Sequence, residues 1–377
     1  MCIPVQNITH PSLPLQVMKG TSHSSKPVAI WLLVGVLMII IQIILGGITR
    51  LTDSGLSITE WKPLLGTIPP RNDQQWNEAF EGYKKIAQYK QLHSYFTLEN
   101  FKSIFFWEWL HRLWGRLIGL VFIIPFLIFL FQRRFSSQMV KPMIVLFLLG
   151  GLQGAIGWIM VKSGLNDENL YVSHIRLAIH FMLALGLLAY TFWFALILLV
   201  PKRQLVSEPS LKKFTILLTV VLVIQLVYGA FMAGLKAATA APTWPSINGE
   251  YIPKNITSYR GQQHSFAWAV VNNPIAVQFI HRSIAYLLVL LLIFFTILAA
   301  KRRHNSLYQS AVWAPVLFAG IQVALGVLAV LDSYKKVPLQ WGSFEWMAQL
   351  HQIVGMLLFL SLVLLLFLLQ KKQYYNR

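Results

Sequence analysis

The sequence predicts an all-α polytopic membrane protein with eight transmembrane helices, arranged as two parallel-repeat four-helix bundles. Of its 377 residues, 56% are hydrophobic and 12% are charged, whereas a soluble domain carries about 25% charged residues. The hydrophobic residues form long continuous runs, unlike the short alternating strands of a membrane β-barrel. The single cysteine, Cys2, excludes an internal disulfide and a thiolate metal cluster.

Eight apolar runs are each long enough to cross about 30 Å of hydrocarbon at roughly 1.5 Å per residue. The residues before them, 1–27, have neither the apolar run of a signal peptide nor the arginines of a mitochondrial transit peptide. We therefore expect a cytoplasmic N-terminal tail and a bacterial plasma (inner) membrane. The expected spans are 28–48, 105–131, 143–161, 175–200, 214–235, 275–300, 311–331 and 346–369.

The basic residues predict the orientation of these spans. With the N-terminus in the cytoplasm, the inner segments hold many lysines and arginines and a single acid, Glu208, as the positive-inside rule requires. Both termini are then cytoplasmic, and the long loops 49–104 and 236–274 face outward. The net charge of +19 does not indicate nucleic-acid binding, because the basic residues are not gathered on one soluble module.

The chain reads as an internal repeat of two four-span halves, 28–205 and 206–377. Residues in the second, third and fourth spans recur in the same order in the sixth, seventh and eighth. An even number of spans per half makes the repeats parallel. The matched pairs are His111 and His281, Arg112 and Arg282, Gln153 and Gln322, Gly157 and Gly326, and His180 and His351.

Four of these residues are histidines in the first turns of even-numbered spans, so we expect them at one depth near the outer face. Ionisable residues inside a membrane are costly and mark function. Two neutral imidazoles in an apolar core suit the axial ligation of a heme iron, whereas structural zinc needs four ligands. The predicted iron ligands are His111 and His180 in one half and His281 and His351 in the other. The alternative is that each is a buried polar group satisfied by a neighbour.

Three arginines accompany these histidines. Arg112 and Arg282 each follow a predicted ligand, and Arg176 lies one turn before His180. Heme propionates directed outward would meet such guanidinium groups. Alternatively, the arginines extend to the lipid headgroups.

The two halves differ chemically at one matched position. Glu108 lies one turn before His111 on the same helix face, and its counterpart before His281 is Gln278. A carboxylate can move protons or stabilise a cation, and an amide cannot. This predicts that the first half performs chemistry and the second holds a permanent cofactor. Alternatively, Glu108 only orients His111 or stabilises a helix N-terminus.

The outer loops carry further signals. The glycines and prolines of segment 46–70 indicate a fixed loop, which could close over the first-half site, mediate docking or be an ordinary interfacial loop. His93 and His264 lie in the outer loops, and we expect both to be solvated.

Taken together, these residues resemble the heme A synthase family, in the subgroup lacking the paired loop cysteines. The resemblance covers about 28–369, and the second outer loop at 241–249 departs from the Phe-Pro-Leu-Met-Asp-Gly form of many members. Its most specific parts are segment 46–70, Glu108-xx-His111-Arg112, Val172-Ser173-His174-xx-Leu177-xx-His180, and the pairs His281-Arg282 and His351-Gln352.

The resemblance implies oxidation of the C8 methyl group of heme O to the formyl group of heme A, through two hydroxylations and loss of water, for terminal oxidase biogenesis. It implies a resident heme b on His281 and His351, and a substrate heme in the first half with Glu108, His111 and His180 as catalytic residues. It also implies an apolar side opening to the lipid bilayer. Implied partners are heme O synthase, cytochrome oxidase assembly factors and an unidentified electron acceptor; self-association into a homo-oligomer is left open.

Two other functions compete with this one. A diheme b-type electron-transfer cytochrome would hold two permanent hemes in similar surroundings, and the difference between Glu108 and Gln278 counts against it. A heme or small-molecule transporter is compatible with parallel repeats, but histidines at a single depth offer no path across the membrane.

Overall fold

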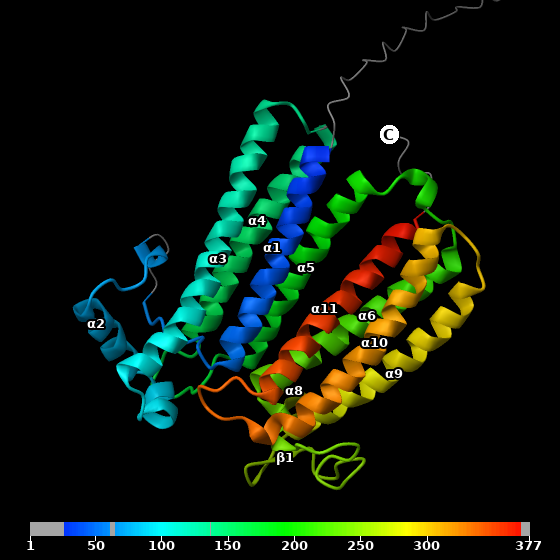
Figure 1. The fold of residues 1–377 in the computed structure, drawn as a ribbon. Helices are drawn as coiled ribbons and strands as arrows, with labels where there is room; N and C mark the ends of the chain where they lie inside the picture. Colours follow the sequence, from blue (N-terminus) through cyan, green and yellow to red (C-terminus); the bar gives the residue numbers. More distant parts are fainter. Residues whose placement is uncertain (1–25, 61–64, 136, 371–377) are drawn as a thin grey trace, which may run out of the picture.

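The computed structural model describes residues 26–60, 65–135 and 137–370. Within these residues, eight helices are long and apolar enough to cross a membrane, which confirms the predicted spans (Figure 1). Most of the expected N-terminal tail, residues 1–25, lies outside the described residues.

The first four long helices form a closed ring. Helix α1 contacts α3 and α5, and α4 contacts the same two helices. The hydroxyl groups of Thr97 and Ser173 cap α3 and α5 by accepting hydrogen bonds from backbone N–H groups, which satisfies donors that a helix start leaves open. The bounds are α1 Lys26–Leu51, α3 Leu98–Phe131, α4 Ser137–Lys162 and α5 His174–Leu199.

The last four long helices form a second ring in the same order of neighbours. Helix α6 contacts α9 and α11, and α10 contacts the same two helices. Asn273 and Asn305 cap α9 and α10. The bounds are α6 Pro209–Gly234, α9 Pro274–Ala300, α10 Ser306–Asp332 and α11 Ser343–Leu368.

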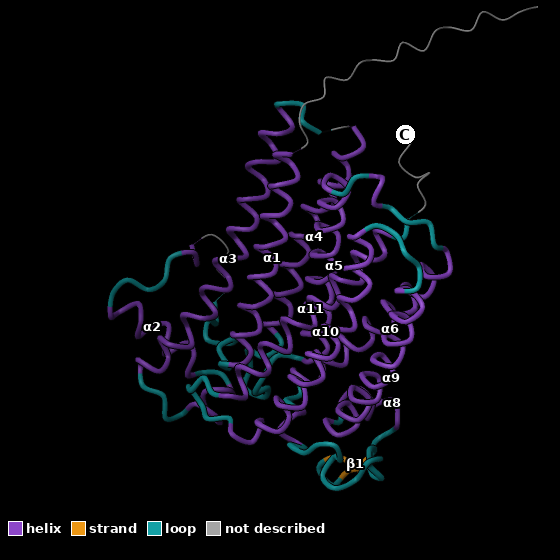
Figure 2. Tube along the Cα trace, turned by 45° about the vertical axis from the view of Figure 1, so that its right-hand side comes forward, coloured by secondary structure: helices purple, strands orange, loops and turns teal. Residues whose placement is uncertain are grey.

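The two rings meet along α1, α5, α6 and α11, which lie side by side in Figures 1 and 2. The largest buried apolar cluster spans this junction and includes Leu188, Leu218 and Leu362. Polar contacts join the rings as well, because the side-chain amide of Gln352 donates to the backbone oxygen of Ile43 at 2.8 Å.

The loop between α1 and α3 is a small folded unit. It contains the short helix η1 (Leu65–Thr67), α2 (Asp73–Lys84) and the π-helix η2 (Tyr89–His93). Its aromatic core continues into the first turns of α3 through Phe101 and Phe105. For this reason α3 begins well before the expected span, and His111 lies several turns inside the helix instead of in its first turns.

The solvated position expected for His93 is wrong. Its side chain is buried in this aromatic core, stacked on Phe96, and its Nδ1 lies 2.6 Å from the hydroxyl oxygen of Tyr83. Burial lowers the pKa of His93 to about 4, so its imidazole is neutral. The sequence placed this residue in a loop, and its burial depends on aromatic residues that only the fold brings together.

The loop between α6 and α9 lies at the same end of the molecule as the first loop, and the end of α11 lies at the opposite end (Figure 1). It contains α7 (Ala237–Ala240), the antiparallel pair β1 (Ser258–Tyr259) and β2 (Gln262–Gln263), and α8 (Phe266–Asn272). Both long loops therefore lie at one end of the helices, as their positions in the sequence predicted.

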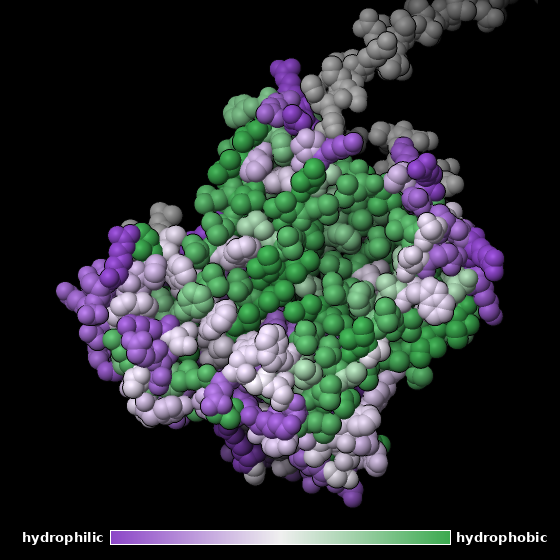
Figure 3. Space-filling view, in the orientation of Figure 1, coloured by the Kyte–Doolittle hydropathy of each residue, from purple (hydrophilic) through white to green (hydrophobic). Residues whose placement is uncertain are grey.

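The outer surface of the helices is apolar. Figure 3 shows a broad hydrophobic band over the long helices, with polar residues at both ends. Leu120, Leu290 and Leu317 are exposed within this surface. Such a belt suits the hydrocarbon of a bilayer, and the protein is a multi-pass membrane protein.

Candidate functional site

The four predicted histidines line one cavity of about 880 Å³, to which all eight long helices contribute. His111 comes from α3 and His180 from α5, whereas His281 comes from α9 and His351 from α11. In the second half, the centroids of the two imidazole rings lie 6.4 Å apart, with their planes inclined by 67°. The structure thus brings together side chains that are far apart in sequence.

A glycine on a neighbouring helix lies against each of two histidines. A Cβ atom built on Gly157 would lie 2.8 Å from Cε1 of His180, and one on Gly326 would lie 2.8 Å from Cε1 of His351. Carbon atoms do not approach this closely without displacement. Only glycine therefore allows these imidazoles to lie against the backbone of α4 and α10.

The other two histidines have the same kind of neighbour at a slightly greater distance. A Cβ atom on Gly46 of α1 would lie 3.3 Å from Nε2 of His111, and one on Gly229 of α6 would lie 3.4 Å from Cε1 of His281. All four odd-numbered spans thus place a glycine beside a histidine of an even-numbered span.

A glutamine precedes each of these glycines by four residues. The side-chain amide of Gln42 donates to the backbone oxygen of His111 at 3.2 Å, and that of Gln153 donates to the backbone oxygen of His180 at 3.0 Å. The Nε2 atoms of Gln225 and His281 lie 3.4 Å apart. Sequence reasoning found the Gln-xxx-Gly pattern in the third and seventh spans. It missed Gln42 and Gln225, although the same spacing was visible in the first and fifth spans.

The tautomer of His351 follows from its surroundings. Its Nδ1 lies 2.9 Å from the backbone oxygen of Gln322, and a carbonyl oxygen can only accept, so Nδ1 carries the proton. Nε2 then keeps the lone pair that binds a metal, the arrangement found at most histidine ligands.

The donor set fits a heme in each half. Each half supplies two imidazoles, and glycines rather than larger side chains lie beside them. Among the described residues no group of three or more His, Cys, Asp or Glu side chains could hold a metal.

Glu108 lines the cavity and is 2% exposed. Its Oε2 accepts hydrogen bonds from the hydroxyl of Ser57 at 2.7 Å and from the backbone N–H of Ile58 at 2.8 Å. Its Oε1 pairs with Arg112 at 2.6 Å, and Arg112 also donates to the backbone oxygen of Ile58. The ion pair lies within α3, and the hydrogen bonds of Ser57 and Ile58 to its two members fasten the first outer loop to this helix.

The second half fastens its outer loop without a carboxylate. Gln278 donates to the backbone oxygen of Ala241 at 3.0 Å, and Arg282 donates to the backbone oxygen of Thr243 at 2.6 Å. The third predicted arginine, Arg176, donates to the backbone oxygen of Ile159 at 2.9 Å. The difference between Glu108 and Gln278 is thus a difference in charge at matched positions.

Gly326→Ala should weaken heme binding in the second half, because the added methyl group would push the His351 ring away from its place beside Gln322. Overpacking of this kind costs about 1–3 kcal/mol, which corresponds to a loss of heme affinity of roughly 5- to 150-fold. Heme content per purified protein measures the effect. Gly320→Ala, on the same helix with open space around its Cβ, is the matched control. Equal heme content in the two variants would contradict the packing argument.

Known proteins are similar to this chain over most of its length. A profile of the COX15-CtaA family, described as cytochrome oxidase assembly protein, matches residues 29–363. A heme A synthase of Flavobacterium psychrophilum is 38% identical, over 89% of this chain and 96% of the relative. A heme A synthase of Rhodopseudomonas palustris strain BisB5 is 41% identical over 90% of each chain, and one of Nitrosospira multiformis is 40% identical over 89% of this chain and 91% of the relative. This chain belongs to the COX15-CtaA family of cytochrome oxidase assembly proteins.

Proposed function

We propose that this protein is a heme A synthase, which oxidises the C8 methyl group of heme O to the formyl group of heme A. Relatives bearing that name match nearly the whole chain. The observation that carries the proposal is one cavity that holds two imidazoles from each half, with the buried carboxylate of Glu108 one turn from His111 and a neutral residue, Gln278, at the matched position of the second half.

The proposal assigns the two halves different tasks. The half at 206–377 would hold a resident heme b between His281 and His351, and the half at 28–205 would receive the substrate between His111 and His180. When bound, the resident heme supplies electron transfer, while the protein supplies position and electrostatics. The matching order of helix neighbours in the two rings supports a duplicated unit.

The first half has more room for a bulky substrate. Gly119, Gly150 and Gly154 line the cavity, and a Cβ atom on any of them would meet nothing within 4 Å. The matched second-half positions hold side chains, Val289, Ala319 and Val323. These glycines lie on α3 and α4. The proposal therefore places an apolar opening toward the lipid between these two helices, where a substrate with a long isoprenoid tail could enter.

In this assignment Glu108 holds a negative charge one turn from His111, at the outer end of the first-half site. Arg112 neutralises that charge and, with Ser57 and Ile58, fixes the carboxylate while the outer loop excludes water. The membrane orientation proposed from the sequence places this end outside the cytoplasm of a bacterial cell.

Heme extraction tests the function directly. The full chain, expressed in a host that makes heme O but no heme A, should yield heme A in the membranes and retain heme b after purification. Membranes of the same host without the chain are the control. Two equivalents of heme b with no heme A, despite a supply of heme O, would instead identify a diheme electron-transfer cytochrome.

A further inference from the structure

The charged residues around the cavity are strongly unbalanced. Two acids line it, Asp53 and Glu108, against a larger set of cations. An excess of positive charge in an apolar cavity is costly unless anionic groups offset it. The six cations are Arg50, Arg112, Arg116, Lys236, Arg282 and Lys336.

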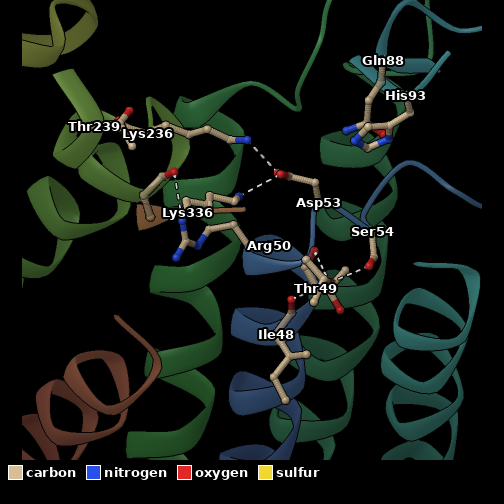
Figure 4. A network of polar contacts seen from close by, with 12 residues as sticks. Ile48, Thr49, Arg50, Asp53, Ser54, Gln88, His93, Lys236, Thr239 and Lys336 are labelled. Carbon is tan, nitrogen blue, oxygen red and sulfur yellow. Dashed lines mark hydrogen bonds and ion pairs between the residues drawn. The ribbon is translucent and has the colours of Figure 1, made fainter. Parts of the chain in front are cut away.

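Three of these cations surround Asp53 at the junction of the two halves (Figure 4). Lys236 approaches Oδ1 of Asp53 at 2.7 Å, and Lys336 approaches Oδ2 at 2.9 Å. Arg50 lies beside them and donates to the backbone oxygen of Ala233 at 3.4 Å. Asp53 belongs to the first half and both lysines belong to the second, so the cluster bridges the two halves. We call Arg50, Asp53, Lys236 and Lys336 the junction cluster.

Asp53 does not balance the cations of the junction cluster. Burial alone would raise the pKa of Asp53, but the two lysines lower it below its ordinary value, so the carboxylate is ionised and both oxygens are occupied. Burial lowers the pKa of Lys236, and the nearby Asp53 offsets this only in part. The Glu345 carboxylate also attracts Arg50, but Glu345 is absent from the residues that line the cavity. An ammonium group has three donors, so both lysines can bind a further carboxylate.

The junction cluster lies one helical turn outward from a histidine of each half. Arg50 follows Gly46, which lies against His111, by four residues. Its partner Ala233 follows Gly229, which lies against His281, by the same number. Four residues of α-helix advance about 6 Å. Arg50 therefore lies between the two histidine pairs, on the side where porphyrin propionates would be if they point outward.

We propose that Arg50, Lys236 and Lys336 form a carboxylate-binding site, shared by both halves, that receives the propionates of the bound porphyrins. This inference rests on the proposed function and extends it, because the sequence directed attention to Arg112 and Arg282. Those two arginines hold the outer loops through the backbone oxygens of Ile58 and Thr243, whereas the junction cluster has cations in excess. Asp53 acts as a counter-ion that competes with the ligand for the same lysines.

Esterified porphyrin provides the test. Iron protoporphyrin IX and its dimethyl ester are titrated into the purified full-length protein, with the Soret absorbance as the readout of dissociation constants. The wild-type protein should bind the free acid more tightly than the ester. Arg50→Gln and Lys336→Gln should each reduce this preference about tenfold, the usual loss for a buried charge-assisted hydrogen bond. Arg50→Lys, which keeps the charge, should retain most of it.

Asp53→Asn makes the test independent of misfolding, because it should change the preference in the opposite direction. Removal of the competing carboxylate should increase the preference for the free acid several-fold. Asparagine tolerates the left-handed backbone of residue 53, whose φ is 55°. Lys335→Gln is the matched control, because the Lys335 side chain is 49% exposed and pairs with Asp332. This variant should prefer the free acid over the ester as strongly as the wild-type protein does.

The outcomes separate this inference from the proposed function. Equal binding of acid and ester by the wild type, or an unchanged preference in Arg50→Gln, Lys336→Gln and Asp53→Asn, would overturn the shared site and leave the heme A synthase assignment standing. Failure of the wild-type protein to bind either porphyrin would overturn both.

Discussion

Glu108→Gln should stop heme A formation while the purified protein keeps its heme b. Glutamine preserves the shape of the side chain but removes the charge that pairs with Arg112, and it cannot exchange a proton. The substitution reproduces in the first half the neutral residue that the second half has at Gln278. Loss of acid–base catalysis typically lowers a rate about 10²–10⁴-fold, so heme A in membrane extracts should fall below detection while heme O accumulates.

The retained heme b makes this prediction specific. Glu108→Ala should give the same product loss, with some loss of stability because Arg112 would lose its buried partner. The matched control is Glu99→Gln, on the same helix, where the acid is exposed and pairs with Lys102. Heme A output from Glu108→Gln at the wild-type level would refute the catalytic role, and loss of heme b would make Glu108 a structural residue.

His351→Ala and His281→Ala should remove the resident heme. Each variant leaves the iron with one axial imidazole and opens a hole in the apolar core beside Gly326 or Gly229. We expect the ratio of heme b to protein to fall at least about tenfold, which corresponds to roughly 1.4 kcal/mol or more of lost binding free energy. Alkaline pyridine spectra of purified protein measure that ratio.

The first-half histidines provide the internal comparison. His111→Ala and His180→Ala should retain heme b, because these two histidines lie in the first ring of helices and the proposed heme b lies in the second. The two variants should not make heme A. His264→Ala, in the outer loop against Trp268, should change neither property. Undiminished heme b in the His281 and His351 variants would contradict the placement of the resident heme.

The eight spans and the gathering of the four histidines could be predicted from sequence. Long apolar runs determine membrane helices almost alone, and equal spacing in two halves places His111 and His281 at equivalent positions. The junction cluster could not be predicted, because Asp53 and Lys236 are 183 residues apart and meet only through the packing of the two halves. The burial of His93 was missed for another reason: its neighbours Tyr83 and Phe96 are close in sequence, but the outer loop shows no periodic pattern that would mark them as a core.

Helix α1 forms a wall that both histidine sites share. Gly46 lies against His111, and a Cβ atom on the next residue, Gly47, would lie 2.7 Å from the side-chain oxygen of Gln352, the neighbour of His351. Adjacent residues of one helix therefore serve two centres, so a shift of this part of α1 would disturb both at once. After a gene duplication, most positions of two copies are free to diverge separately, but here the copies would have to evolve together.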